Sequence, residues 1–203
     1  MAATAKIVTD TERLVLRPFE ASDIDAVLDY YTEPDAQRYL EPRARDRRDV
    51  AVAVDQMRQQ YRLTRPGDNL FSAVERKSDG RLIGQVSLRW TDATAAQSEL
   101  RFVIGQKYRL QGYASETVRA MLAVGFGTFS FHRIFARCSG RNRASAHLLK
   151  KLGMRLEAHY REHALYGGEW DEELHFAILD REWGRDQQVK TLPVLRAEPR
   201  LRA

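Results

Sequence analysis

The sequence of 203 residues has one cysteine and no long apolar run. A single cysteine, Cys138, excludes an internal disulfide and leaves too few soft ligands for a structural zinc site. No apolar stretch approaches the roughly 18 residues that a membrane-spanning helix needs. The opening residues, Met-Ala-Ala-Thr-Ala-Lys6, have no apolar segment typical of a secretion signal. We therefore expect a cytoplasmic protein with no membrane partner.

Charged residues make up 30% of the chain and hydrophobic residues 43%, which is typical of a soluble globular protein. The length fits one core. We expect an N-terminal tail over residues 1–10, a single domain over residues 11–183, and a basic, partly disordered tail over residues 184–203. The net charge of +5 suits an anionic ligand, RNA or a ribosomal surface, and it does not choose among them.

The apolar pattern predicts a mixed α/β fold. Helices are predicted where apolar residues recur every three or four positions, at residues 22–33, 49–63, 113–130 and 143–152. Strands are predicted by alternation and turn residues, at residues 13–19, 70–76, 81–90, 98–104, 133–139, 156–165 and 172–179. The strand, helix, strand order over residues 99–139 requires a crossover, and therefore one parallel pair in an otherwise antiparallel sheet.

One loop has features of a phosphate site. It reads Ile104-Gly-Gln-Lys-Tyr-Arg109-Leu-Gln-Gly112-Tyr-Ala114-Ser-Glu116 and leads from a predicted strand into a predicted helix. A helix N-terminus attracts phosphate through unpaired N–H groups and its positive dipole end. Small residues at Gly112 and Ala114 let the backbone approach a pyrophosphate, and Arg109 adds a cation. Taken alone, the pattern also fits a tight turn that needs glycine for its backbone angles.

A second sequence motif follows this loop further along the chain. Together with Asn142-Arg-Ala-Ser145-Ala-His-Leu-Leu-Lys-Lys-Leu-Gly153-Met154, the loop resembles the GCN5-related N-acetyltransferase (GNAT) superfamily, and within it the branch of ribosomal-protein N-terminal acetyltransferases. The resemblance covers roughly residues 11–183. It implies a mostly antiparallel sheet of about seven strands flanked by about four helices, with the parallel pair splayed at the cofactor site. It also implies acetyl-CoA as the acetyl donor.

The resemblance also assigns binding residues. Phe102, Val103 and Ile104 would lie along the pantetheine. Asn142 would contact the pantetheine or the nucleotide side of the cofactor, although local chemistry alone makes it a helix N-cap. Backbone groups of the loop would hold the pyrophosphate, namely those of Arg109, Gln111, Gly112, Tyr113, Ala114 and Ser115.

The amine acceptor must lose a proton, because an alkylammonium has a pKa near 10.4. Glu99 opens the strand that leads into the loop, where the family often has an acidic residue, so it is the first candidate base. A glutamate at a strand start also fits a solvated edge charge. Glu162 and His163 are the second candidates.

Two further roles concern the thioester. The backbone N–H of Val103 is predicted to polarise its carbonyl. Many members of the superfamily protonate the leaving thiolate with a tyrosine, but the matching position here is Leu149. Ser145 is the candidate replacement, directly or through water, although a first-turn helix residue is its local role. Cys138 alternates with apolar residues, so we expect direct transfer in a ternary complex rather than an acyl-cysteine.

The sequence therefore predicts an acetyl-CoA-dependent N-acetyltransferase. Its acceptor would be a primary amine, either a peptide N-terminus such as that of a ribosomal protein or a small molecule. No metal is expected, because the five histidines lack paired ligand spacing on a helix. A homodimer is expected. The alternative is a catalytically silent protein of the same fold that binds RNA or the ribosome through its basic surface.

Overall fold

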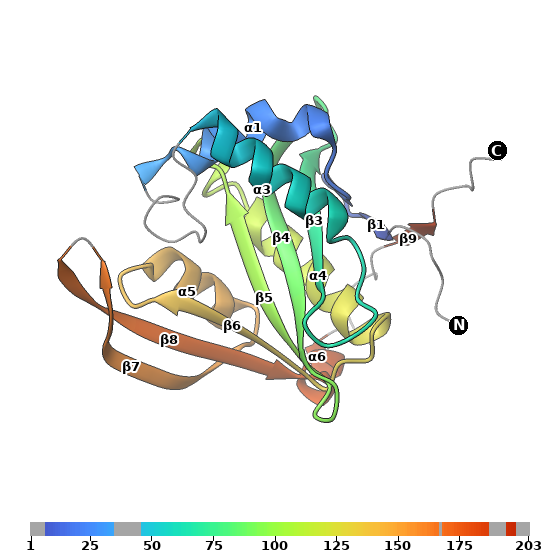
Figure 1. Cartoon of the computed structure of the whole chain (residues 1–203). Coiled ribbons are helices and arrows are strands. Elements are labelled where there is room, and N and C mark those ends of the chain that lie inside the picture. Colours follow the sequence, from blue (N-terminus) through green and yellow to red (C-terminus); the bar gives the residue numbers. More distant parts are fainter. Residues whose placement is uncertain (1–6, 35–45, 167, 187–193, 198–203) are drawn as a thin grey trace.

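A computed structural model describes residues 7–34, 46–166, 168–186 and 194–197. In this part of the chain nine strands form one sheet, in the order β7-β8-β6-β5-β4-β3-β2-β1-β9 (Figure 1). The strands are β1 Ile7–Asp10, β2 Leu14–Arg17, β3 Asn69–Arg76, β4 Arg81–Asp92, β5 Gln97–Ile104, β6 Arg133–Ser139, β7 Arg155–Tyr166, β8 Glu169–Leu179 and β9 Val194–Ala197.

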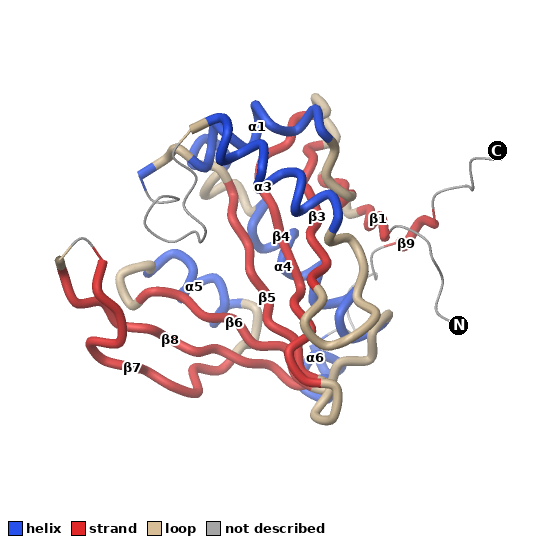
Figure 2. Tube along the Cα trace, viewed as in Figure 1, coloured by secondary structure: helices blue, strands red, loops and turns tan. Residues whose placement is uncertain are grey.

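The helices lie on both faces of the sheet (Figure 2). Their bounds are α1 Ile24–Tyr31, α3 Arg47–Gln59, α4 Tyr113–Gly127, α5 Arg143–Lys151 and α6 Asp180–Asp186, with short 3-10 turns at Ala21–Asp23 and Gln106–Tyr108. Asp46 begins α3 by accepting hydrogen bonds from the N–H groups of Arg48 and Asp49. None of the described helices is long and apolar enough to cross a membrane.

Two apolar clusters hold the layers together. The larger joins α4 and α5 to the sheet through buried residues such as Leu88, Leu100 and Met121. The smaller joins α1 and α3 to it through Val27 and Val54. Each cluster buries many large side chains, and burial of one such side chain is worth about 1.5–3 kcal/mol. The sheet is therefore fixed from both sides, which makes it a rigid support for a site.

The predicted architecture is confirmed: a mixed, mostly antiparallel sheet with one parallel pair, β5 and β6. The strand number differs from the expected seven because β1 and β9 are four-residue strands, too short to show alternation in the sequence. They pair with each other antiparallel. The division of the chain near residues 10 and 183 stays a prediction.

The helix predicted over residues 49–63 begins and ends earlier, as α3. Gln60 already has a non-helical backbone, and Tyr61 forms an isolated bridge with Leu70. The helix predicted to reach residue 130 ends at Gly127, close before Ser130, which has a φ of 52°. Neither difference moves the strands that carry the site.

Candidate active site

The parallel pair β5 and β6 separates along its length. The two strands are paired at Gln97↔Arg133, Ser98↔Ile134 and Glu99↔Phe135, and at no later position although both are fully described. On its other side, β5 stays paired with β4 as far as Ile104. The last part of β5 therefore has one backbone edge open toward β6, and Figure 1 shows the two strands diverging.

The direction of the backbone groups at this opening follows from strand alternation. The N–H of Gly105 donates to Ile83 O of β4 at 2.9 Å, so it points away from the opening. Because direction alternates along a regular antiparallel ladder, the N–H of Val103 also faces β4, and those of Phe102 and Ile104 face the opening. An extended ligand in the opening therefore meets Phe102 and Ile104.

The loop after β5 turns directly into α4. Gly112 is the N-cap residue and has a φ of 85°, and the preceding Leu110 has a φ of 61°. The first intrahelical bond at this end runs from Glu116 N–H to Gly112 O at 3.1 Å. The N–H groups of residues 113–115 are thus the orphan donors of the helix N-terminus. They are among the backbone groups that the sequence analysis predicts for the pyrophosphate, which also include those of Arg109, Gln111 and Gly112.

Two residues that the sequence analysis missed hold this loop. Arg13 Nη1 donates to Gln111 O at 3.0 Å, and its Nε donates to Glu116 Oε2 at 2.8 Å. Glu33 accepts a 2.8 Å bond from Gln106 N–H and lies 3.5 Å from an Arg109 nitrogen. These partners are between 73 and 103 residues apart in the chain, so no local pattern signals them.

Charged side chains around the loop form hydrogen bonds with backbone groups. Burial raises the pKa of Glu116, but hydrogen bonds from Thr11 and Arg13 outweigh it and leave that pKa lowered. Arg109 Nε donates to Ile104 O at 3.2 Å, which links the loop to the end of β5. A carboxylate that stays ionised keeps Arg13 in place beside Gly112.

Helix α5 begins shortly after the C-terminal end of β6. Asn142 Oδ1 accepts a 3.0 Å bond from Ser145 N–H, so Asn142 is the N-cap. The Ser145 hydroxyl has no hydrogen-bond partner among the described residues and is half-buried. Leu149, at the position of the missing tyrosine, is 1% exposed and belongs to the larger core cluster. It contributes packing and no proton.

Glu99 is the last residue of β5 that pairs with β6, and it is 3% exposed. Its Oε1 accepts bonds from Arg137 Nε at 2.9 Å and from Arg101 Nε at 3.1 Å. Burial raises the pKa of Glu99, but the two guanidinium groups outweigh it and leave the pKa lowered. This carboxylate is therefore ionised, and it binds a proton weakly.

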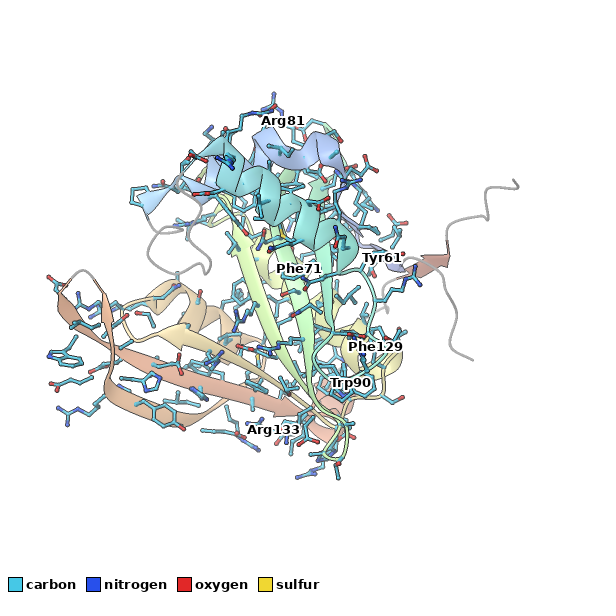
Figure 3. The ribbon with its side chains drawn as sticks, viewed as in Figure 1. Tyr61, Phe71, Arg81, Trp90, Phe129 and Arg133 are labelled. Carbon is cyan, nitrogen blue, oxygen red and sulfur yellow. The ribbon has the colours of Figure 1, made fainter. Side chains whose placement is uncertain are left out.

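Glu99 also lines a hollow of about 380 Å³, together with Arg89, Trp90, Arg137 and His175. These residues come from β4, β5, β6 and β8, and Figure 3 shows Trp90 and Arg133 at the end of the sheet where the central strands come together. The hollow therefore lies where β5 and β6 begin to separate. Sequence reasoning did not bring these four strands together.

His175 supplies the imidazole that lines this hollow. Its Nε2 lies 2.6 Å from Glu173 Oε1, and its ring meets that of Tyr160 at 4.8 Å between centroids. If the carboxylate accepts the Nε2 proton, Nδ1 is left as an unprotonated acceptor. His163 lies 3.7 Å from the same oxygen of Glu173. Glu162 is exposed, with a φ of 51°, at an irregularity in β7.

Cys138 packs against the larger core cluster on the opposite face from His175 and Glu173. Burial, followed by the negative charge of Glu173, raises the pKa of its thiol to about 11. A thiol with this pKa is almost entirely protonated at neutral pH, so it is a poor nucleophile. Among the described residues no group of three or more metal-ligating side chains occurs.

A twisted, mostly antiparallel sheet with one splayed parallel pair, and a glycine-capped helix at the open end, defines the class of the GNAT fold. Residues 13–155 match the acetyltransferase (GNAT) domain family, and the chain belongs to this family. Both the fold and the sequence are those of acyltransferases. The comparisons therefore favour an enzyme over a catalytically silent RNA-binding protein.

The relatives agree with this assignment. An uncharacterised N-acetyltransferase of Bacillus subtilis, YnaD, is 32% identical over 175 residues, which is 85% of this chain and 97% of that protein. The crystal structure of a GNAT acetyltransferase from Bacillus anthracis is 29% identical, with a TM-score of 0.75 over 86% of this chain and 99% of that one. The Escherichia coli ribosomal protein uS5-alanine N-acetyltransferase is 30% identical over 84 residues, 41% of this chain and 43% of that protein.

Proposed function

We propose that this chain transfers an acetyl group from acetyl-CoA directly to a primary amine in a ternary complex. The observation that carries the proposal is the open backbone edge of β5, which leads straight into the orphan N–H groups of α4. The edge suits the amides of an extended pantetheine, and the helix end suits a pyrophosphate. The donor would supply a thioester, a carbonyl activated toward attack by an amine.

The binding residues of the proposal are those predicted from the sequence. Backbone groups of the loop hold the pyrophosphate with Arg109 beside them, and Asn142 contacts the pantetheine or the nucleotide side of the cofactor. The loop residues are Arg109, Gln111, Gly112, Tyr113, Ala114 and Ser115. Phe102, Val103 and Ile104 form the strand along which the pantetheine lies. The fit rests on the left-handed backbone of Gly112 and on the unpaired edge of β5.

For the oxyanion we propose the N–H of Phe102 in place of that of Val103. Strand alternation directs Phe102 into the opening and Val103 toward β4. A donor that points at the thioester carbonyl stabilises the charge that develops there. We propose that the Ser145 hydroxyl donates a hydrogen bond to the leaving thiolate and relays to it a proton from solvent water, because this hydroxyl has no other partner among the described residues and Leu149 has no proton to give.

For the amine proton the hollow offers two groups, Glu99 and His175. Glu99 remains a candidate on position, but an ionised carboxylate between two guanidinium groups is a weak base. We therefore propose that His175, oriented by Glu173, accepts the proton. Glu99 then acts by holding Arg101 and Arg137 in place.

The finer assignments are also proposals. The partial likeness to the uS5-alanine N-acetyltransferase supports the ribosomal-protein branch and a protein N-terminus as one acceptor class. The exposed Leu165 and Trp170 of the β7–β8 hairpin support a homodimer, which sedimentation velocity measures. A cytoplasmic location stays a prediction that fractionation of the native cells tests.

The function is tested by binding and turnover together. Acetyl-CoA at about 100 times its dissociation constant should stabilise the fold by about 2.7 kcal/mol, seen as a rise in Tm of several degrees. Thiol release should then depend on an added primary amine. A chain that neither binds acetyl-CoA nor releases thiol with any amine is not this enzyme.

A further inference from the structure

The hollow at the end of β5 is lined with more positive than negative charge. Arg89, Arg101 and Arg137 come from three adjacent strands, and strand pairing puts them on one face of the sheet, with Arg89 directly opposite Glu99. Two carboxylates, Glu99 and Glu173, accompany them. Of these five groups Arg89, Arg137 and Glu99 line the hollow itself, so two guanidinium groups and one carboxylate leave its lining with an excess of one positive charge.

The positive charge in excess is that of Arg89. Arg101 and Arg137 share the carboxylate of Glu99, at 3.1 and 2.9 Å. Arg89 lines the same hollow, and its guanidinium has no hydrogen bond or ion pair with any residue that the structure describes, although its backbone carbonyl accepts a bond from Ser98 Oγ. Its guanidinium is therefore available to a ligand.

The negative group that Arg89 meets does not belong to the donor. The proposed pyrophosphate site lies beyond Ile104, and from Glu99 to Ile104 five residues at about 3.3 Å each span about 17 Å. The donor's phosphates lie at that far end, and its uncharged thioester end reaches the hollow. A negative group beside the point of transfer therefore belongs to the acceptor.

We propose that the acceptor is a small amine that carries a carboxylate, in the manner of a free amino acid, and that Arg89 binds this carboxylate. This inference rests on the proposed function and names its substrate class. Guanidinium and carboxylate make paired, charge-assisted hydrogen bonds. A hollow of about 380 Å³ accommodates a small molecule.

The same charges assist the reaction and select against other amines. Nearby cations disfavour an ammonium and so lower the pKa of the bound amine, which helps His175 to remove its proton. A polyamine or an aminoglycoside brings further positive charge and is repelled. A peptide N-terminus has an amide where an amino acid has its carboxylate, so it leaves Arg89 without a partner.

The test compares acceptors that differ only in the carboxylate. Thiol release is measured with acetyl-CoA and each of the common L-amino acids, their carboxamides, dipeptides and a polyamine. At least one amino acid should exceed its own carboxamide in kcat/KM by about 10- to 100-fold, the range for a hydrogen bond to a charged group. Arg89→Gln should remove that difference, and Arg89→Lys should restore part of it.

The matched control is Arg81→Gln, which removes an arginine at the far end of the same strand, as Figure 3 shows. Arg81→Gln should change neither the kcat/KM for the amino acid nor that for its carboxamide. Acetyl-CoA affinity should be equal in all variants. Equal or better turnover of carboxamides, dipeptides or polyamines overturns this inference and leaves the transferase intact. Absence of thiol release with every amino acid overturns it as well. Absence of acetyl-CoA binding together with silence of every amine overturns the proposed function itself.

Discussion

The two ends of β5 are built from different groups. At the Ile104 end, backbone N–H groups and a left-handed glycine face the proposed donor, and side chains such as Arg13 only hold the backbone in place. At the Glu99 end, charged and polar side chains from four strands surround a hollow. A backbone site suits a cosubstrate that is the same throughout a family. A side-chain site can change its specificity by substitution without altering the fold.

The largest effect should come from the Glu99 end, at His175. Replacing it with asparagine should lower kcat/KM for the acceptor by about 100-fold or more, the usual contribution of a general base. Acetyl-CoA affinity should not change, since the proposed donor site is formed by the backbone of β5. His163→Asn, in the same cluster but outside the hollow's lining, is the control and should keep most of the activity.

The pH profile separates the two candidate bases. With His175 as the base, the acidic limb of the kcat/KM profile, where activity falls on acidification, is lost in His175→Asn and kept in Glu99→Gln. With Glu99 as the base, the limb lies below the ordinary glutamate pKa of 4.5, because the pKa of Glu99 is lowered. An acidic limb of that second kind, absent from Glu99→Gln and kept in His175→Asn, would assign the role to Glu99.

At the Ile104 end, Gly112→Val should weaken acetyl-CoA binding by at least about tenfold. A φ of 85° costs a side chain about 1–2 kcal/mol, and about 1.4 kcal/mol equals a factor of ten. The new Cβ would also lie 3.2 Å from Arg13 Nη2 and disturb the bond to Gln111. Calorimetry of acetyl-CoA binding measures the loss, with circular dichroism to show that the variant folds.

Gly127→Ala is the matched glycine control. It lies at the other end of α4, has no atom within 4 Å of the added Cβ, and needs no positive φ. Its affinity for acetyl-CoA should equal that of the unaltered chain. Equal affinity in Gly112→Val as well would mean that the loop does not hold the donor.

The two ends also differ in how far the sequence reveals them. The loop after Ile104 and the start of α5 are local, so Gly112, Asn142 and Ser145 were placed from short strings. Glu99 was placed at the strand start. Its partner Arg101 is two residues away on the same face of β5, where strand alternation could have found it, but Arg137 is 38 residues away and no local pattern signals it. His175 was considered only as a metal ligand, since its role needs β4, β5, β6 and β8 side by side. The direction of the Val103 N–H depends on the pairing register, which the pattern of residues does not fix.

The smallest effect concerns Cys138, which lies between the two ends on β6. Because the pKa of the Cys138 thiol is raised to about 11, iodoacetamide at pH 8 should leave activity unchanged, and Cys138→Ala should keep kcat/KM within about twofold.

Double-reciprocal plots for the two substrates should intersect, as direct transfer requires, because both ends of β5 are then occupied together. Parallel plots and an acetylated protein mass in the absence of acceptor would instead indicate a covalent relay, with the two ends used in turn.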